Sequence, residues 1–132
     1  MVLNIIQELN NKVQMYDLQA QVFKLLSHPA RIAILEILRD EENCVCHIET
    51  ILGFRQAYIS QQLSVLREAG LIQDRRDGWN IFYRVVRPEV YNILDAAYTM
   101  ATSNSPLGSQ RLDNAQCPCP KCAARRGLVR VR

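Results

Sequence analysis

The sequence lacks any apolar run long enough to cross a membrane, since no stretch approaches the roughly 18 consecutive apolar residues of a transmembrane helix. The N-terminus also lacks the basic flank and small-residue cleavage site of a signal peptide. Paired catalytic carboxylates, a glycine-rich phosphate loop and a nucleophile beside a plausible base are missing as well. We therefore expect a cytoplasmic protein that is not an enzyme and has no membrane partner.

Cysteine is scarce and confined to two places. All five cysteines lie in NCVCH at 43–47 and in CPCPKC at 117–122. In a reducing compartment, an odd number of closely spaced thiols suits a disulfide framework poorly. The two clusters instead indicate metal ligation or thiol redox chemistry.

Glycine and proline are absent from residues 2–26, where apolar residues recur at alternating steps of four and three. This pattern predicts helix with a heptad stripe. The stripe can be the inward face of one or two helices in a monomer, but its length ahead of the compact part favours pairing between subunits, so we expect a homodimer. Its members are Val2, Ile6, Leu9, Val13, Tyr16, Ala20 and Phe23.

The next segments predict three short helices. Pro29 suits the first turn of the first of them. Two more are expected at 44–52 and 56–69, each ended by a glycine, and the short turn between them gives a helix-turn-helix. The buried side of the helix after Pro29 is expected to be Ile32, Ile34, Leu35, Ile37 and Leu38.

After the helix-turn-helix, the spacing of apolar residues changes from a helical period to one typical of β-strands. Two β-prone runs at 71–76 and 80–86, joined by a turn that includes Asp77-Gly78, predict a hairpin, or wing. A last helix is expected from Pro88 to about Ala101. The predicted fold is therefore mainly α with a small β-hairpin, a homodimeric winged helix-turn-helix. Residues 1–102 form its DNA-binding and dimerisation domain, and 103–132 form a flexible linker with a cysteine-rich basic tail.

Positive charge gathers in the middle and the tail of the chain. Residues 53–88 carry six basic and three acidic side chains, and residues 117–132 carry five basic and no acidic ones. This segregation suits a polyanionic partner, although a local excess of this size is also common on solvated surfaces.

Four stretches resemble the winged-helix repressors of the ArsR/SmtB metal-sensing family. They are LLSHPARIAILEIL (25–38), NCVCHIETIL (43–52), QAYISQQLSVLREAGLI (56–72) and DRRDGWNIFYRV (74–85). The resemblance implies a homodimer that represses its own operon by binding an imperfect palindrome in double-stranded DNA. It also implies that the repressor leaves this operator when an effector binds.

A recognition helix enters the major groove with its polar face. The helix at 56–69 carries glutamine, which can pair with adenine edges, and serine and tyrosine, which can reach phosphates or bases. Two arginines near the hairpin tip can reach phosphate or the minor groove. The predicted DNA contacts are Gln56, Tyr58, Ser60, Gln61, Gln62, Ser64, Arg75 and Arg76.

Residues two apart on a regular helix point about 200° away from each other. Cys44 and Cys46 can therefore face one ion only from a distorted first turn. Asn43 is a candidate N-cap that places both thiols there, where the helix dipole lowers the thiol pKa. Closely spaced thiolates select soft ions and exclude magnesium and calcium.

The Cys-Val-Cys pair resembles that of arsenite- and cadmium-responsive members of the family, although many arsenite sensors have a third thiol where this chain has Glu49. Trivalent arsenic is the leading effector, then cadmium or lead, then zinc. Cys117, Cys119 and Cys122 lie between prolines that prevent helix. They either complete a site of three or four thiolates with the pair, in the same or the partner subunit, or form a second site.

The helix bearing the pair is expected to pack on the recognition helix, so that unwinding its first turn around an ion tilts the recognition helix. The alternative is a thiol-redox or persulfide sensor in which Cys44 or Cys46 forms a disulfide with a tail cysteine. Excess reductant separates the two, because metal sensing survives it and a disulfide switch resets.

Overall fold

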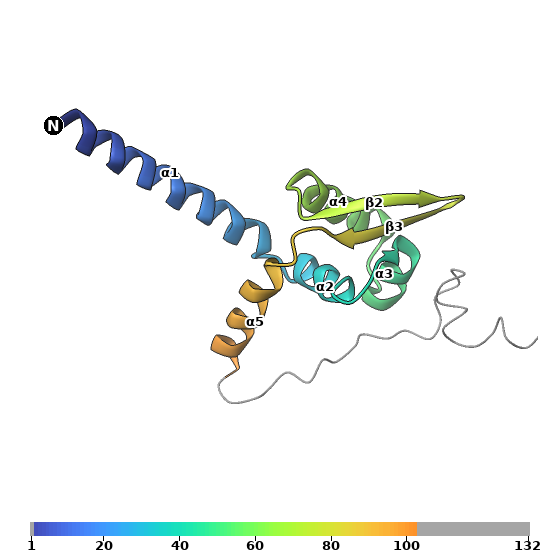
Figure 1. Ribbon diagram of the computed structural model, residues 1–132. Helices are drawn as coiled ribbons and strands as arrows, with labels where there is room; N and C mark the ends of the chain where they lie inside the picture. Colours follow the sequence, from blue (N-terminus) through green and yellow to red (C-terminus); the bar gives the residue numbers. More distant parts are fainter. Residues whose placement is uncertain (1, 103–132) are drawn as a thin grey trace, which may run out of the picture.

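The computed structural model describes residues 2–102, which form five α-helices and a three-stranded antiparallel sheet (Figure 1). The helices are α1 (Val2–Leu26), α2 (Pro29–Ile37), α3 (Val45–Leu52), α4 (Gln56–Glu68) and α5 (Val90–Ala101). The strands are β1 (Asn43–Cys44), β2 (Ile72–Asp77) and β3 (Asn80–Val85). This order confirms the predicted winged helix-turn-helix.

The first helix extends away from the other elements (Figure 1). Leu26, at its C-terminal end, is its buried residue, while the predicted heptad stripe is exposed. Leu9 is 56% exposed, Val13 55% and Phe23 61%. The stripe is therefore not an inward face within residues 2–102.

The core lies between α2, α3 and α4 and continues to the hairpin and α5. Ile34, Leu35, Ile48, Ile59 and Leu63 are fully buried in it. Burial of each such side chain stabilises the fold by about 1.5–3 kcal/mol.

The prediction that Ile32 is buried was wrong, because 36% of its surface is exposed. At about 100° per residue, Ile32 lies about a quarter turn from the middle of the side that carries Leu35 and Leu38, and almost opposite the fully buried Ile34.

A left-handed glycine ends α3 as predicted. Gly53 has φ 68°, a backbone conformation that residues with a Cβ rarely adopt. Its N–H donates to the Glu49 carbonyl at 2.8 Å. The chain then turns and begins α4 at Gln56. The helix-turn-helix is thus confirmed.

The sheet contains one strand that the sequence did not predict. In β1, Asn43 pairs with Tyr83 and Cys44 with Phe82, so the helix expected from Cys44 begins at Val45 instead. Strands β2 and β3 pair from Ile72 opposite Val85 to Asp77 opposite Asn80, which confirms the predicted wing.

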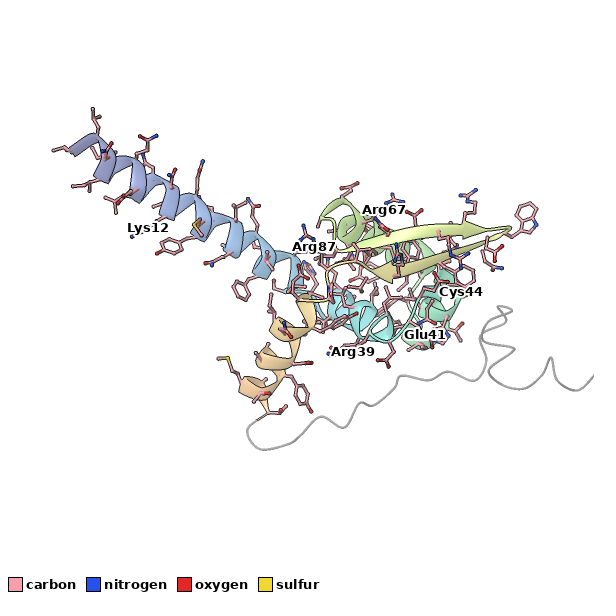
Figure 2. All side chains as sticks on the ribbon, viewed as in Figure 1. Lys12, Arg39, Glu41, Cys44, Arg67 and Arg87 are labelled. Carbon is pink, nitrogen blue, oxygen red and sulfur yellow. A yellow bond between two sulfur atoms is a disulfide. The ribbon has the colours of Figure 1, made fainter. Side chains whose placement is uncertain are left out.

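Arg39 lies where α2 meets α5 (Figure 2). Its Nη2 is 2.6 Å from Asp95 Oδ1 and 2.8 Å from Glu36 Oε1, and its guanidinium carbon lies 4.4 Å from the centroid of the Tyr91 ring. The hydrogen bonds that Arg39 donates to Glu36 and Asp95 raise the pKa of Arg39, and the bond to Asp95 lowers the pKa of that carboxyl. These contacts attach α5 to the core.

Candidate functional site

The outward side of α4 carries most of the polar residues predicted to contact DNA. Ile59, Leu63 and Leu66 anchor the inner side and leave this side free of the core. Ser64 is half-buried at its edge. The exposed members are Gln56, Tyr58, Ser60 and Gln61.

Gln62, also predicted to contact DNA, does not lie on this exposed side. Its side chain is 6% exposed, and its Oε1 accepts a 2.8 Å hydrogen bond from Arg31 Nε. Arg31 also donates from Nη1 to the Leu25 carbonyl at 3.1 Å. Gln62 therefore connects the recognition helix to α2 and to the end of α1.

Two of the exposed residues near the wing tip are candidates for contact with DNA. Arg76 is exposed and forms no ion pair with any residue in the part of the chain that the structure describes. Trp79, in the turn after Gly78, is 102% exposed and is the single tryptophan of the chain. Trp79 is not among the residues predicted to contact DNA, although a large aromatic residue beside a predicted hairpin turn is a usable signal.

Arg75 is held against the body of the molecule. Its Nη2 is 2.6 Å from Glu42 Oε1, and its guanidinium carbon is 4.8 Å from the centroid of the Phe82 ring. The Glu42 hydrogen bond is the largest cause of a raised Arg75 pKa. The two adjacent arginines thus have different surroundings.

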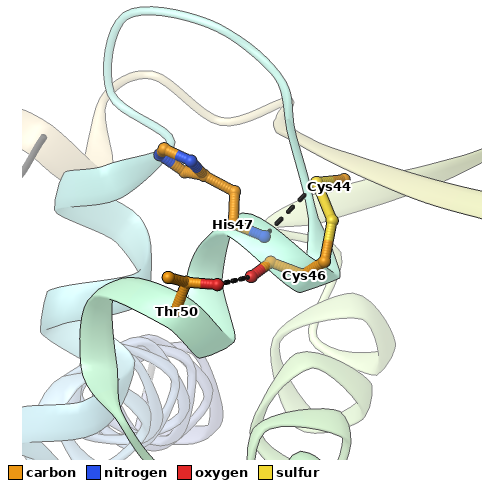
Figure 3. Close-up of a disulfide and its surroundings, with 4 residues drawn as sticks. All are labelled: Cys44, Cys46, His47 and Thr50. Carbon is orange, nitrogen blue, oxygen red and sulfur yellow. Dashed lines mark hydrogen bonds between the residues drawn. A yellow bond between two sulfur atoms is a disulfide. The ribbon is translucent and has the colours of Figure 1, made fainter. Parts of the chain in front are cut away.

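Cys44 and Cys46 lie side by side where β1 leads into α3, and the structure joins them as a disulfide (Figure 3). Their Cα atoms are 5.4 Å apart. Cys44 is 1% exposed and packs with Phe82, and Cys46 is partly buried against them. Proximity of the two sulfurs, which the sequence predicted only for a distorted first turn, arises because Cys44 is in extended conformation ahead of the helix.

The helix cap differs from the prediction. Cys44 is the N-cap of α3, and its Sγ accepts a hydrogen bond from the His47 N–H at 3.3 Å (Figure 3). Asn43, the expected cap, instead donates from Nδ2 to the Ile37 carbonyl at 3.0 Å. The cysteine pair thus lies at the positive end of the α3 dipole.

The cysteine pair offers two soft sulfur atoms as metal ligands, and few other ligands from the described part of the chain lie nearby. Within residues 2–102, no three His, Cys, Asp or Glu side chains are grouped so as to hold a metal ion. Glu49, one turn beyond the pair, has a buried Oε1 without a hydrogen-bond partner among these residues. The predicted tail ligands, Cys117, Cys119 and Cys122, lie outside the described residues. When reduced, the pair offers two soft sulfur donors, and residues 2–102 group no third donor with them.

Among the described residues, none of the helices has the length and apolar character needed to cross a membrane.

The chain is similar to several regulators. It is 40% identical over 84 residues to the HTH-type transcriptional regulator Rv0081 of Mycobacterium tuberculosis, covering 63% of this chain and 74% of that protein. It is 40% identical over 81 residues to the biofilm growth-associated repressor of Agrobacterium fabrum, covering 61% and 69%. Identity to the arsenic resistance transcriptional regulator ArsR1 of Pseudomonas putida is 43% over 76 residues, covering 57% and 59%.

Solved structures share the fold. The crystal structure of Rv0081 superposes with a TM-score of 0.60 at 39% identity, covering 66% of this chain and 88% of that one. The homodimeric winged helix-turn-helix DNA-binding domain of Mb0332 from Mycobacterium bovis gives 0.59 at 30% identity, covering 68% and 83%. The family described as bacterial regulatory protein, arsR family, matches residues 28–74, from the start of α2 into β2. The fold and the similarity to these regulators show that the chain belongs to the ArsR family of DNA-binding transcriptional regulators.

Proposed function

We propose that this protein is a homodimeric repressor that leaves its operator when a thiophilic metal or metalloid ion binds Cys44 and Cys46. The observation that carries the proposal is the position of the two sulfurs. They lie together at the junction of the sheet that carries the wing and the helix that packs on α4. An ion held there lies beside Phe82 of the wing and at the start of α3, the helix that packs on α4.

The exposed stripe of α1 supports dimerisation. A 25-residue helix with this much exposed apolar surface is stabilised by packing against another apolar face. The Mb0332 domain, which this chain resembles, is homodimeric. Two recognition helices related by a twofold axis read a palindrome.

The exposed residues of α4 support a role in reading DNA. Gln56 and Gln61 are the candidates for bidentate contacts to adenine, and Tyr58 and Ser60 for contacts to phosphate or base edges. On the wing, Arg76 is the candidate for a phosphate or minor-groove contact. Gln62 supports the helix from within and is left out of this contact set.

Two adjacent thiols favour trivalent arsenic, cadmium, lead or zinc over harder cations. Arsenite leads, because ArsR1, a relative of this chain, is an arsenic resistance regulator. Cys117, Cys119 and Cys122 are proposed as additional ligands, either at the same ion or at a second one. Residues 103–132 accordingly act as a linker and ligand-bearing tail to the 1–102 domain.

Ion capture is coupled to DNA through packing. When Cys44 and Cys46 turn to share one ion, the position of Cys44 Sγ relative to the His47 N–H changes, so the first turn of α3 rearranges. Ile48 of α3 shares the core with Ile59 and Leu63 of α4, so this movement reaches the recognition helix. A coupling free energy of about 1–3 kcal/mol is enough for regulation.

Operator binding by the reduced full-length protein tests the proposal. The probe is a labelled duplex from the promoter region of its own operon, titrated with arsenite, cadmium, lead or zinc in excess reductant. Cys44→Ser and Cys46→Ser should bind DNA but respond less, since serine is a good N-cap and keeps α3 intact. Ser27→Ala, an exposed remote change, is the control. Full response in both cysteine variants would contradict the proposal.

A chain that ends at Gln116 tests the tail. If its response to each ion equals that of the intact protein, the tail cysteines are not ligands at the sensing site.

The Cys44–Cys46 disulfide favours a second candidate, a thiol-redox repressor. Here a peroxide takes two electrons and two protons from the thiols, and the disulfide replaces the ligated ion as the signal. The partner of Cys44 is then Cys46 and not a tail cysteine. Loss of DNA binding after peroxide, and its recovery with reductant in the absence of any ion, identifies this mechanism.

A further inference from the structure

Three residues, one from each strand, lie in a row across the sheet. Cys44 of β1 is opposite Phe82 of β3, and Phe82 is opposite Arg75 of β2. Directly opposed residues in antiparallel strands project to the same face, with Cβ atoms about 4.5–5.5 Å apart. Cys44 and Phe82 are buried together, and Cys46 packs against them. The cysteine pair is therefore in contact with the hairpin itself.

Arg75, at the β2 end of this row, also contacts the segment just before β1. Its guanidinium lies over the Phe82 ring, and its Nη2 and Nε are 2.6 Å and 3.3 Å from the two carboxylate oxygens of Glu42. Glu42 immediately precedes β1 and stands two residues before Cys44. Arg75, a residue of the wing, is therefore hydrogen-bonded to the segment that leads into the cysteine pair.

Arg76 lies in a different environment. It is opposite Ile81 in the next row, so its side chain projects to the other face of the sheet. It is exposed and forms no ion pair within residues 2–102. Of the two adjacent arginines, Arg76 is available to DNA, and Arg75 is engaged with the protein.

We propose that Arg75 is a positioning residue that couples the cysteine pair to the wing through Phe82 and Glu42. The inference rests on the proposed function, since it assigns a path by which an event at Cys44 reaches the DNA-binding surface. When Cys44 Sγ takes a new bonding partner, its packing against Phe82 changes and the adjoining segment with Glu42 moves. The Glu42–Arg75 bridge then no longer holds the hairpin in the orientation that DNA requires.

Substitution of Glu42 tests the positioning role by the sign of its effect. Loss of an acidic side chain strengthens DNA binding if only charge matters. Glu42→Gln is instead expected to weaken binding to the operator duplex by about two- to fivefold, the range that an exposed ion pair supports. Arg75→Gln is expected to weaken it by the same factor, and the double variant by no more than either single one.

The salt dependence of binding distinguishes positioning from phosphate contact. The slope of log affinity against log salt should stay at the wild-type value in Arg75→Gln. Arg76→Gln, the matched control on the adjacent residue, should reduce its magnitude by about 0.9. An equal reduction in Arg75→Gln would make Arg75 a DNA contact and overturn the inference.

The response to thiol capture tests the coupling directly. Phenylarsine oxide bridges two neighbouring thiols: two arsenic–sulfur bonds form, and the oxide oxygen leaves as water with the two thiol protons. Operator affinity of the reduced full-length protein is measured with and without this probe. Wild type and Arg76→Gln should lose about tenfold or more, within the usual range of allosteric coupling. In Glu42→Gln and Arg75→Gln the loss should fall below about threefold.

The outcomes separate this inference from the proposed function. Equal losses in wild type and in both bridge variants would overturn the role of Arg75 and leave the cysteine-based function standing. An unchanged affinity in wild type would overturn the proposed function and the coupling with it. Arg75→Lys, which keeps the positive charge over Phe82 and can still pair with Glu42, should retain most of the wild-type response, and a loss of response as large as that of Arg75→Gln would contradict the inference.

Discussion

Arg31 Nε donates a partly buried hydrogen bond to Gln62 Oε1 at 2.8 Å, and this contact ties α4 to α2. Because Arg31 also donates to the Leu25 carbonyl, the same guanidinium joins α4 to the end of α1. The orientation of α4 relative to α1 therefore depends on Gln62, a residue on the inner side of the helix.

Gln62→Ala should lower the free energy of unfolding by about 1–3 kcal/mol, because the partly buried Arg31 loses an acceptor. Urea denaturation followed by circular dichroism measures this loss. Gln61→Ala, one residue away on the exposed side, should leave stability within about 0.5 kcal/mol of wild type but weaken operator binding. If the two substitutions affect stability equally, Gln62 does not have this internal role.

Trp79 should report the approach of the wing to DNA. As a fully exposed single tryptophan, it should emit at long wavelength in the free protein and be quenched readily by iodide. Binding of the operator duplex should shift the emission to shorter wavelength and reduce quenching, because the ring becomes shielded from water. At a salt concentration that abolishes binding, the shift should disappear. Unchanged emission, while anisotropy of the labelled duplex reports binding, would place the hairpin tip away from DNA.

The Arg39–Asp95 pair predicts a pH effect on stability. The pKa of Asp95 in the folded protein is lowered below its ordinary value of 3.8, chiefly by the hydrogen bond from Arg39. The contribution of the pair is therefore present above about pH 4 and is lost as pH falls through the lowered pKa. Asp95→Asn should reduce the Tm at pH 7, by a small amount because the carboxylate is largely exposed, and the difference from wild type should vanish in acid. A difference that persists at low pH would assign the effect to something other than this carboxylate.

Most of the fold follows from local patterns. The period of apolar residues, together with Pro29, Gly53 and Gly70, places the helices, and the Asp77-Gly78 turn places the hairpin. Strand β1 cannot be predicted from such patterns. Its two residues are too few to show an alternating pattern, and their partner strand is almost 40 residues away. Local periodicity carries no information on a pairing of that kind.

The residue types of the candidate site were predictable from the sequence, but the direction in which some of their side chains point was not. Gln62 is three residues after Ile59 and four before Leu66, so helical spacing alone places it in the buried stripe despite its polar side chain. Which of Arg75 and Arg76 faces outward depends on the register of β2, and the partner of Arg75 is Glu42, 33 residues away. The positions of Cys44 and Cys46 in sequence are evident, whereas their contact with Phe82 requires β1.

The exposed stripe of α1 predicts how the dimer can be broken without unfolding the domain. Leu9 and Val13 are more than half exposed in the single chain, so Leu9→Asp/Val13→Asp removes no packing from its core. In a helix–helix interface, each new carboxylate loses water without gaining a partner, and the interface is strongly disfavoured. Sedimentation equilibrium should show a dimer for wild type and a monomer for the variant. Urea denaturation should show that the core of the domain still unfolds cooperatively, although α1 loses helix without its partner face.

Gln7→Asp/Asn11→Asp is the matched control, because it adds the same charge to the same helix on the opposite side. It should remain dimeric and bind the operator duplex as wild type does. The Leu9/Val13 variant should bind about tenfold or more weakly, since each monomer then engages one half-site alone. A Leu9/Val13 variant that stays dimeric would show that subunits pair through another surface, and the long apolar face of α1 would then need a different partner.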